Sequence, residues 1–118
     1  MGDPTLDPTA PVQAQLDAYN RRDLEAFLAC YAPDCRMEDG AGAVLAADRA
    51  AMRPQYARLF ADGPDLHADV PTRIVVGGYV IDEEHVTGAR QPGFPEAAHA
   101  AAVYRVADGL IRHVRVLL

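Results

Sequence analysis

Residues 12–39 read VQAQLDAYNRRDLEAFLACYAPDCRMED, and this stretch carries the strongest signals for the fold. Val12, Leu16 and Tyr19 recur at helical spacing, which predicts a helix with one apolar face. The helix should begin near Thr9 and end in the polar Asn-Arg-Arg run that follows the tyrosine.

A second, shorter helix is expected to begin behind Asp23, because an aspartate side chain can cap the first turn. Pro33 should stop this helix, and residues 35–39 alternate as a strand does. Asp39 therefore lies where a strand ends beside two helices, which makes it a candidate for the rim or floor of a pocket. The apolar side of the second helix is expected to hold Leu24, Phe27, Leu28 and Tyr31.

Residues 40–47 are small and flexible in composition, so a loop is expected there. Asp48 can cap a third helix that runs to about Ala61. Pro54 lies within this helical pattern. It should bend the helix or mark a later start, because proline lacks the backbone N–H that a helix interior uses.

Beyond residue 65 the apolar period changes to two, which predicts strands. Tight turns are expected at 77–78, which is Gly-Gly, and at 108–109, which is Asp-Gly. Pro71 indicates a bulge or a sheet edge. The expected strands span about 66–76, 79–87, 96–106 and 110–117, with a loop at 88–95.

This order of elements predicts an α+β fold with helices on one face of a curved antiparallel sheet. Curving such a sheet around helices makes a cone with a cavity at its open end. Residues 1–8 are expected to be a frayed tail, and residues 9–118 a single domain.

The stretch DAYNRRDLEAFLACYAPDCRMED at 17–39 resembles the nuclear transport factor 2-like superfamily, in particular its SnoaL-like members. These include bacterial steroid delta-isomerase-like and polyketide-cyclase-like proteins. The resemblance extends from about residue 11 to residue 117. It implies a cystatin-like, cone-shaped barrel, a small apolar or polyketide- or steroid-like ligand, and a homodimer. It does not by itself imply one reaction, since one fold hosts many chemistries.

Composition narrows the possible functions. The net charge is −6 and the arginines are scattered, so no nucleic-acid surface is expected. No apolar run is long enough for a membrane span. Cys30 and Cys35 make no disulfide framework, which favours reduced thiols in a cytoplasmic protein. The chain contains no lysine, no serine and no Gly-rich dinucleotide motif. Schiff-base chemistry, serine triads and nucleotide cofactors are therefore not expected.

Asp39 is the first candidate for chemistry. The resemblance places it, in the sequence Met-Glu-Asp, at the position of the proton-shuttling aspartate of ketosteroid isomerases. A carboxylate in an apolar pocket gains basicity, which suits that role. The alternative is a structural aspartate that accepts backbone hydrogen bonds in the turn before Gly40.

The same resemblance places Gln15 and Ala102 where these isomerases hold the tyrosine and the protonated aspartate of an oxyanion hole. Gln15 can still donate a hydrogen bond to a substrate, but Ala102 cannot. Steroid isomerisation by that mechanism is therefore not expected.

Strand alternation predicts which residues of the later strands face the cavity. These are Glu83, His85 and Thr87 on one strand, and His113, Arg115 and Leu117 on the last strand. A slip of one residue would turn all of them outward. The candidate catalytic set is Asp39, His85 and His113, and the candidate substrate-binding residues are Gln15, Tyr31, Tyr56, Glu83, Tyr104 and Leu117.

Two histidines and a carboxylate could also hold a metal ion. No local ligand spacing supports such a site, so no metal and no other cofactor are expected. His67 and His99 are expected at the surface.

Two functions stay open at this point. One is acid/base catalysis on a small molecule by an isomerase, cyclase, dehydratase or hydrolase. The other is a non-catalytic binding or dimerisation module. A homodimer is expected through the outer face of the sheet, which should carry Val103, Val114 and Val116.

Overall fold

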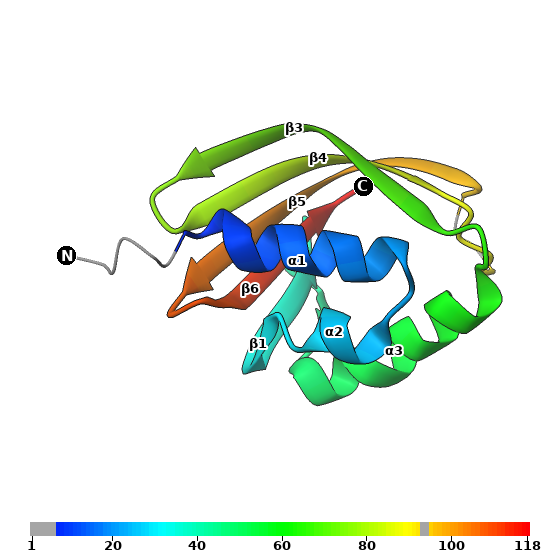
Figure 1. Ribbon diagram of the computed structural model, residues 1–118, viewed down its shortest axis with the longest axis horizontal. Coiled ribbons are helices and arrows are strands. Elements are labelled where there is room, and N and C mark those ends of the chain that lie inside the picture. Colours follow the sequence, from blue (N-terminus) through cyan, green and yellow to red (C-terminus); the bar gives the residue numbers. More distant parts are fainter. Residues whose placement is uncertain (1–6, 93–94) are drawn as a thin grey trace.

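A computed structural model describes residues 7–92 and 95–118. In this part of the chain the helices lie on one face of a curved, unclosed sheet (Figure 1), so the predicted α+β class is confirmed. Residues 1–6 of the expected tail and residues 93–94 of the expected loop lie outside the described residues. The elements are α1 (Thr9–Asn20), α2 (Leu24–Leu28), β1 (Tyr31–Asp39), β2 (Val44–Ala46), α3 (Arg49–Asp62), β3 (His67–Val76), β4 (Tyr79–Thr87), β5 (Ala97–Ala107) and β6 (Leu110–Leu117).

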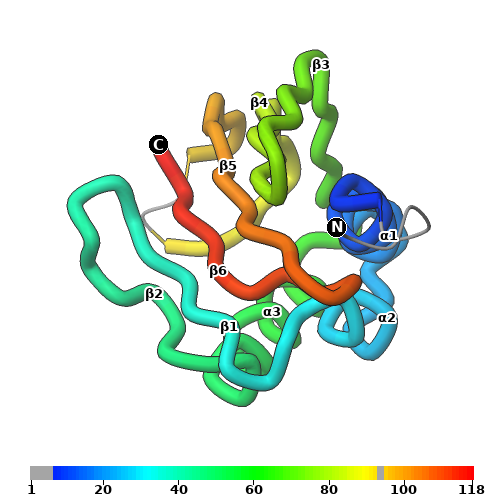
Figure 2. The backbone as a smooth tube through the Cα atoms, turned by 90° about the vertical axis from the view of Figure 1, so that its left-hand side faces the viewer, coloured from blue at the N-terminus to red at the C-terminus, as the bar shows by residue number. Residues whose placement is uncertain are grey.

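The described strands form one sheet in the order β2-β1-β6-β5-β4-β3. Strands β3 to β6 make the expected antiparallel meander. One pair differs from the antiparallel expectation, because β1 runs parallel to β6. Figure 2 shows the sheet bending from β3 round to β1, with α1 and α2 on the inner side of the bend.

Aspartate caps begin the helices as the sequence predicts. The Asp23 carboxylate accepts a hydrogen bond from the Ala26 N–H at 3.1 Å, and the Asp48 carboxylate accepts one from the Ala51 N–H at 2.9 Å. α1 differs, because its N-cap residue is Pro8, which has no side-chain cap, and the Asp7 side chain accepts the Thr9 N–H at 2.9 Å beside it.

The structure places Pro33, Pro54 and Pro71 in three different settings. Pro33 was expected to stop α2, but it lies inside β1, where the pairing with β6 is irregular between Tyr31 and Arg36. A strand tolerates proline at such a place because no ladder hydrogen bond is lost. Pro54 lies inside α3, which begins at its aspartate cap and not later. Pro71 lies in β3, which is both an edge strand and irregular between Asp69 and Thr72.

The two tight turns are confirmed between β3 and β4 and between β5 and β6. Gly77 has φ of 57°, and Asp108 and Gly109 have φ of 54° and 77°, the left-handed values that a two-residue hairpin needs. The segment 40–47 is not a loop throughout, since β2 forms within it and pairs with Met37 and Glu38 of β1.

The core lies between the helices and the inner face of the sheet. Phe27 of α2 is its aromatic centre, with ring centroids 5.0 Å from Tyr31, 4.5 Å from Tyr56 and 5.6 Å from Phe60. The Asn20 side chain fastens α1 to β3, because its amide both donates to and accepts from the Ala68 backbone, at 3.0 and 2.8 Å. Within the described chain, no helix has the length and apolar character to cross a membrane.

Candidate functional site

A cavity of about 480 Å³ lies between the helices and the inner face of the sheet. Its wall is mostly apolar and takes side chains from every helix and every strand of the described chain. The wall residues include Gln15 and Tyr19 of α1, Phe27 of α2, Tyr31 and Met37 of β1, Tyr56 of α3, Glu84 of β4, Ala98, Ala100, Ala102 and Tyr104 of β5, and Val114 and Val116 of β6.

The space exists because one strand supplies small side chains. Ala98, Ala100 and Ala102 alternate along β5 and all face inward, so methyl groups form this part of the floor. Aromatic side chains from the helices form the opposite wall.

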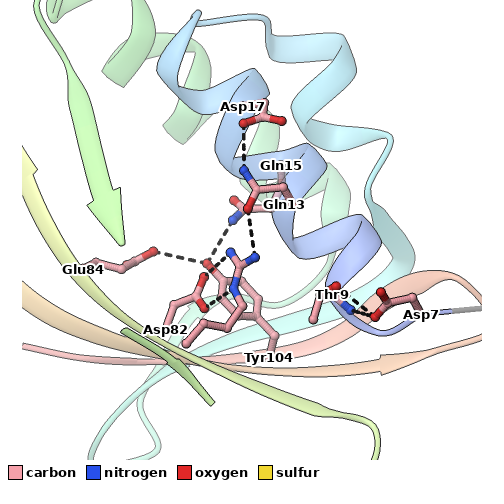
Figure 3. A network of polar contacts seen from close by, with 9 residues as sticks. Asp7, Thr9, Gln13, Gln15, Asp17, Asp82, Glu84 and Tyr104 are labelled. Atoms are coloured by element: carbon pink, nitrogen blue, oxygen red, sulfur yellow. Dashed lines mark hydrogen bonds and ion pairs between the residues drawn. The ribbon is translucent and has the colours of Figure 1, made fainter. Parts of the chain in front are cut away.

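A chain of hydrogen bonds crosses one end of the cavity. The Tyr31 hydroxyl donates to Gln15 Oε1 at 3.0 Å, and Gln15 Nε2 donates to the Tyr104 hydroxyl at 3.2 Å. The Tyr104 hydroxyl in turn donates to Glu84 Oε2 at 3.4 Å (Figure 3). The carboxyl group of Glu84 is therefore the end of a polar chain that starts on β1.

Glu84 is the titratable carboxyl group in the cavity wall. Burial raises the pKa of Glu84 from 4.5 to about 7, and the negative charge of Asp82 acts in the same direction. The hydrogen bond from Tyr104 and the positive charge of Arg73 lower it. The group can therefore accept or release a proton near neutral pH, as a general acid or base must.

β4 has two inward-facing carboxylates, Asp82 and Glu84, and the surroundings of Asp82 differ from those of Glu84. Its side chain is 0% exposed, and Arg73 binds it with two hydrogen bonds, from Nε at 2.7 Å and from Nη2 at 3.0 Å. Arg73 also donates to Gln13 of α1 at 2.8 Å. Asp82 thus has a full charge partner, whereas Glu84 has a single tyrosine hydroxyl.

The tyrosines of the wall are hydrogen-bond donors. Burial raises the pKa of Tyr31 and of Tyr104 well above the usual tyrosine value, and it raises the pKa of Tyr56 as well. All three hydroxyls therefore keep their protons at neutral pH. The Tyr56 hydroxyl donates only to the sulfur of Met37 at 3.5 Å. A thioether is a weak acceptor, so this donor is the most readily transferred to a ligand.

The structure brings four of the expected substrate-binding residues into the cavity wall: Gln15, Tyr31, Tyr56 and Tyr104. Asp39 is placed elsewhere. Its Oδ1 accepts hydrogen bonds from the Ala41 and Ala43 N–H groups, both at 2.9 Å, in the turn after β1. This is the structural alternative that the sequence allowed, because the carboxylate closes its own turn and Asp39 is not among the residues that line the cavity.

The faces predicted for two strands are wrong by one residue. Glu84 and Val86 of β4 line the cavity, so Glu83 and His85 lie on the outer face. In β6 the cavity-lining residues are Val114, Val116 and the neighbouring Leu118, whereas His113, Arg115 and Leu117 lie on the outer face. Val114 and Val116 were expected on the outer face and are part of the cavity wall instead.

The three candidate catalytic residues are therefore not gathered in the cavity. His113 binds Glu38 of β1 through its Nε2 at 2.5 Å, and Asp39 is held in its turn. His85 stacks on His99, with ring centroids 4.8 Å apart. A catalytic role for these residues in the cavity has no geometric basis.

Glu84 is the residue that the sequence reasoning missed, although a signal was present. Adjacent residues of a strand face opposite sides of the sheet, so one of Glu83 and Glu84 had to face the cavity whichever phase was chosen. Asp82 and Val86 share the inner face with Glu84 and are both buried. Treating the two glutamates as a pair of alternatives would have kept the correct one.

The family model described as a SnoaL-like domain matches residues 12–114. An uncharacterised cystatin-fold protein from Novosphingobium aromaticivorans is 26% identical, with a TM-score of 0.85, over 95% of this chain and 98% of that one. No curated protein matches the chain significantly.

Two further solved structures share the fold at lower identity. One is a hypothetical protein with a ketosteroid isomerase-like fold from Catenulispora acidiphila, in complex with trimethylamine. It is 21% identical, with a TM-score of 0.74, over 91% of this chain and 83% of that one. The other is an LEH-like epoxide hydrolase from M. tuberculosis, 16% identical, with a TM-score of 0.78, over 93% of this chain and 80% of that one.

The raised pKa predicts how stability depends on pH. In the unfolded chain Glu84 releases its proton near 4.5, but in the folded chain it holds the proton up to about pH 7. Its contribution to stability is thus fully present below the unfolded value and is lost as pH rises through the folded one. Between about pH 5 and pH 8, the free energy of unfolding of Glu84→Gln should therefore rise relative to that of the wild type by on the order of 2 to 3 kcal/mol.

Urea denaturation at several pH values measures this difference. Glu96→Gln, which removes an exposed carboxylate, is the control for the loss of one charge and should show little change with pH. A Glu84→Gln difference that stays constant over the same range would mean that the carboxyl is not held in its protonated form by burial.

Proposed function

The chain belongs to the SnoaL-like domain family, and we propose that it binds a small, largely apolar molecule in its cavity and transfers a proton to or from that molecule through Glu84. The observation that carries this proposal is the Glu84 carboxyl in an apolar wall, with a pKa raised by burial to about 7. The proton-transfer group is thus placed at Glu84 in preference to Asp39.

The chemistry that fits best is enolisation of a carbonyl compound. Ionised Glu84 removes a proton from a carbon next to the carbonyl, and the electron pair of the broken C–H bond moves to the carbonyl oxygen. The Tyr56 hydroxyl, held only by a weak bond to Met37, can donate to that oxygen and stabilise its charge. Return of the proton to another carbon gives an isomerase. Attack of the carbanion on a second carbonyl breaks its C=O π bond, and the alkoxide that forms takes the proton from Glu84, which gives a cyclase.

Binding without turnover is the alternative, and one observation favours it. The Gln15 amide is already engaged on both sides, by Tyr31 and by Tyr104, and the Tyr104 hydroxyl already donates to Glu84. These polar groups therefore satisfy one another in the empty cavity. Ala102, which lines the cavity, offers no further donor.

Hydrogen–deuterium exchange on a simple ketone tests for proton transfer. We expect the chain to speed the loss of the α-proton NMR signals of β-tetralone in D₂O, and Glu84→Gln to lower that rate by at least about 10²-fold, since general base catalysis contributes 10²–10⁴-fold. Tyr104→Phe should raise the pKa of Glu84 further, because the hydrogen bond that lowers it is lost. The pH at which the rate is half-maximal should move upward accordingly.

Two results of this experiment would count against proton transfer by Glu84. If the exchange rate with wild-type protein is no faster than in buffer while β-tetralone still binds, the protein is a binding module. If the wild type speeds exchange and Glu84→Gln does so equally, Glu84 is not the group that transfers the proton.

Filling the cavity tests the binding part separately. Ala102→Leu places a larger side chain among the alanines of the floor and should abolish binding of β-naphthol, followed by its fluorescence. Ala97→Leu adds the same side chain to the exposed start of β5 and should leave binding unchanged. Equal affinities of the two variants would place the ligand outside the cavity.

A homodimer through the outer face of the sheet is part of the same proposal. Ile74, Ile81 and Val103 are aligned across β3, β4 and β5, because each is paired with the next in the strand register. Ile74 is 50% exposed and Leu117 of β6 is 40% exposed. An apolar row of this kind on an open sheet favours a covered face.

Sedimentation at micromolar concentration measures the oligomeric state, for which we expect a dimer. Ile74→Glu should shift it toward monomer, because a charge in an apolar contact is costly. Val75→Glu changes the next residue, which is equally solvent-accessible but lies on the opposite face of the hairpin, and it should leave the dimer intact. A wild-type monomer at this concentration would contradict the proposal.

A further inference from the structure

A second group of functional side chains lies on the outer face, away from the cavity. The Glu83 Oε2 atom lies 2.7 Å from His99 Nε2 and 3.9 Å from His85 Nε2. The two imidazole rings stack with centroids 4.8 Å apart and an angle of 15° between their planes. One possible ligand atom from each residue falls within 4.8 Å of the others.

The strand pairing explains why these residues meet. His85 of β4 is directly opposite His99 of β5, so their side chains leave the same face of the sheet side by side. Glu83 precedes His85 by two residues and shares its face. The arrangement therefore rests on two central strands of the sheet and not on a mobile loop.

The residue types and spacing suit a transition-metal ion. Imidazole nitrogen and carboxylate oxygen bind Zn²⁺ at about 2.0–2.2 Å, which places neighbouring ligand atoms of a tetrahedral site about 3.3 Å apart. The two distances from Glu83 lie on either side of this value. Small rotations of exposed side chains would equalise them, and the metal would take the place of the hydrogen bond between Glu83 and His99.

We propose that Glu83, His85 and His99 bind one Zn²⁺ ion on the outer face of the sheet, with the remaining position filled by water. Glu83 and Glu84 point to opposite faces of β4, so this site is separate from the cavity and from the proton transfer proposed there. No metal was expected because no segment of the sequence has ligand spacing, but these ligands come from two paired strands that are separate in the sequence.

Titration calorimetry with ZnCl₂ on the full chain, with any polyhistidine tag removed, tests the proposal. We expect one Zn²⁺ per chain. His85→Gln and His99→Gln should each weaken binding by at least about tenfold, because even the loss of an outer-shell partner costs 10–100-fold. Both side chains are solvent-exposed, so these variants should fold, and melting curves check that they do.

His113→Gln is the matched control. It also removes a histidine that is paired with a glutamate, Glu38, but the pair lies on β6 and β1 and offers a single imidazole. Cys30→Ala is the control for zinc binding by a thiol, since Cys30 is free and partly exposed. Both variants should bind Zn²⁺ as the wild type does.

The result is decided by the stoichiometry and by which variants lose binding. One ion per chain that depends on both His85 and His99 supports the site. No binding at micromolar Zn²⁺, equal affinity in the His85→Gln and His99→Gln variants, loss of binding in Cys30→Ala, or one ion per two chains would each overturn it.

Discussion

The hydrogen bonds that meet at the Tyr104 hydroxyl connect α1 to the sheet at the cavity. Gln15 is 4% exposed, so its amide needs partners inside the protein, and the structure supplies them from β1 and β5. This requirement holds α1 at a set height above the sheet at the cavity end, while the Asn20 amide holds it to β3 at the helix end. Because the alanines of β5 are too small to fill the space beneath, a covered cavity remains.

Burial in the cavity region also sets the protonation behaviour of the carboxylates there. Two carboxylates on the inner face of β4 meet different surroundings. Asp82 is paired in two places by Arg73, which also binds Gln13, so its charge is compensated within the fold. Glu84 receives one hydroxyl hydrogen bond and feels the charge of Asp82, so its charged form is disfavoured. Asp82 has a charge partner and Glu84 has none. This difference separates a structural carboxylate from the one that is proposed to react.

Strand alternation extends this contrast to the outer face. Asp82 and Glu84 face the core, whereas Glu83 and His85 face outward and meet His99. β4 therefore contributes to both proposed sites, with the proposed proton-transfer group inside and the proposed metal ligands outside. The apolar row of Ile74, Ile81 and Val103 lies on that same outer face, next to the row that holds Glu83. Coverage of this face by a second copy would bring the ligand set close to an interface.

The sequence by itself determined the features that depend on neighbours along the chain. The Asp23 and Asp48 caps, the Gly77 turn and the α+β order follow from local hydrogen bonding and backbone freedom. Only the tertiary structure decided which face of β4 is inside. Residues 82–85 of that strand are all polar, so hydrophobic alternation gives no contrast there, and the choice passes to its partners. Arg73 on β3 compensates the charge of the inward-facing Asp82, and Glu84 shares that face because residues two apart in a strand point to the same side.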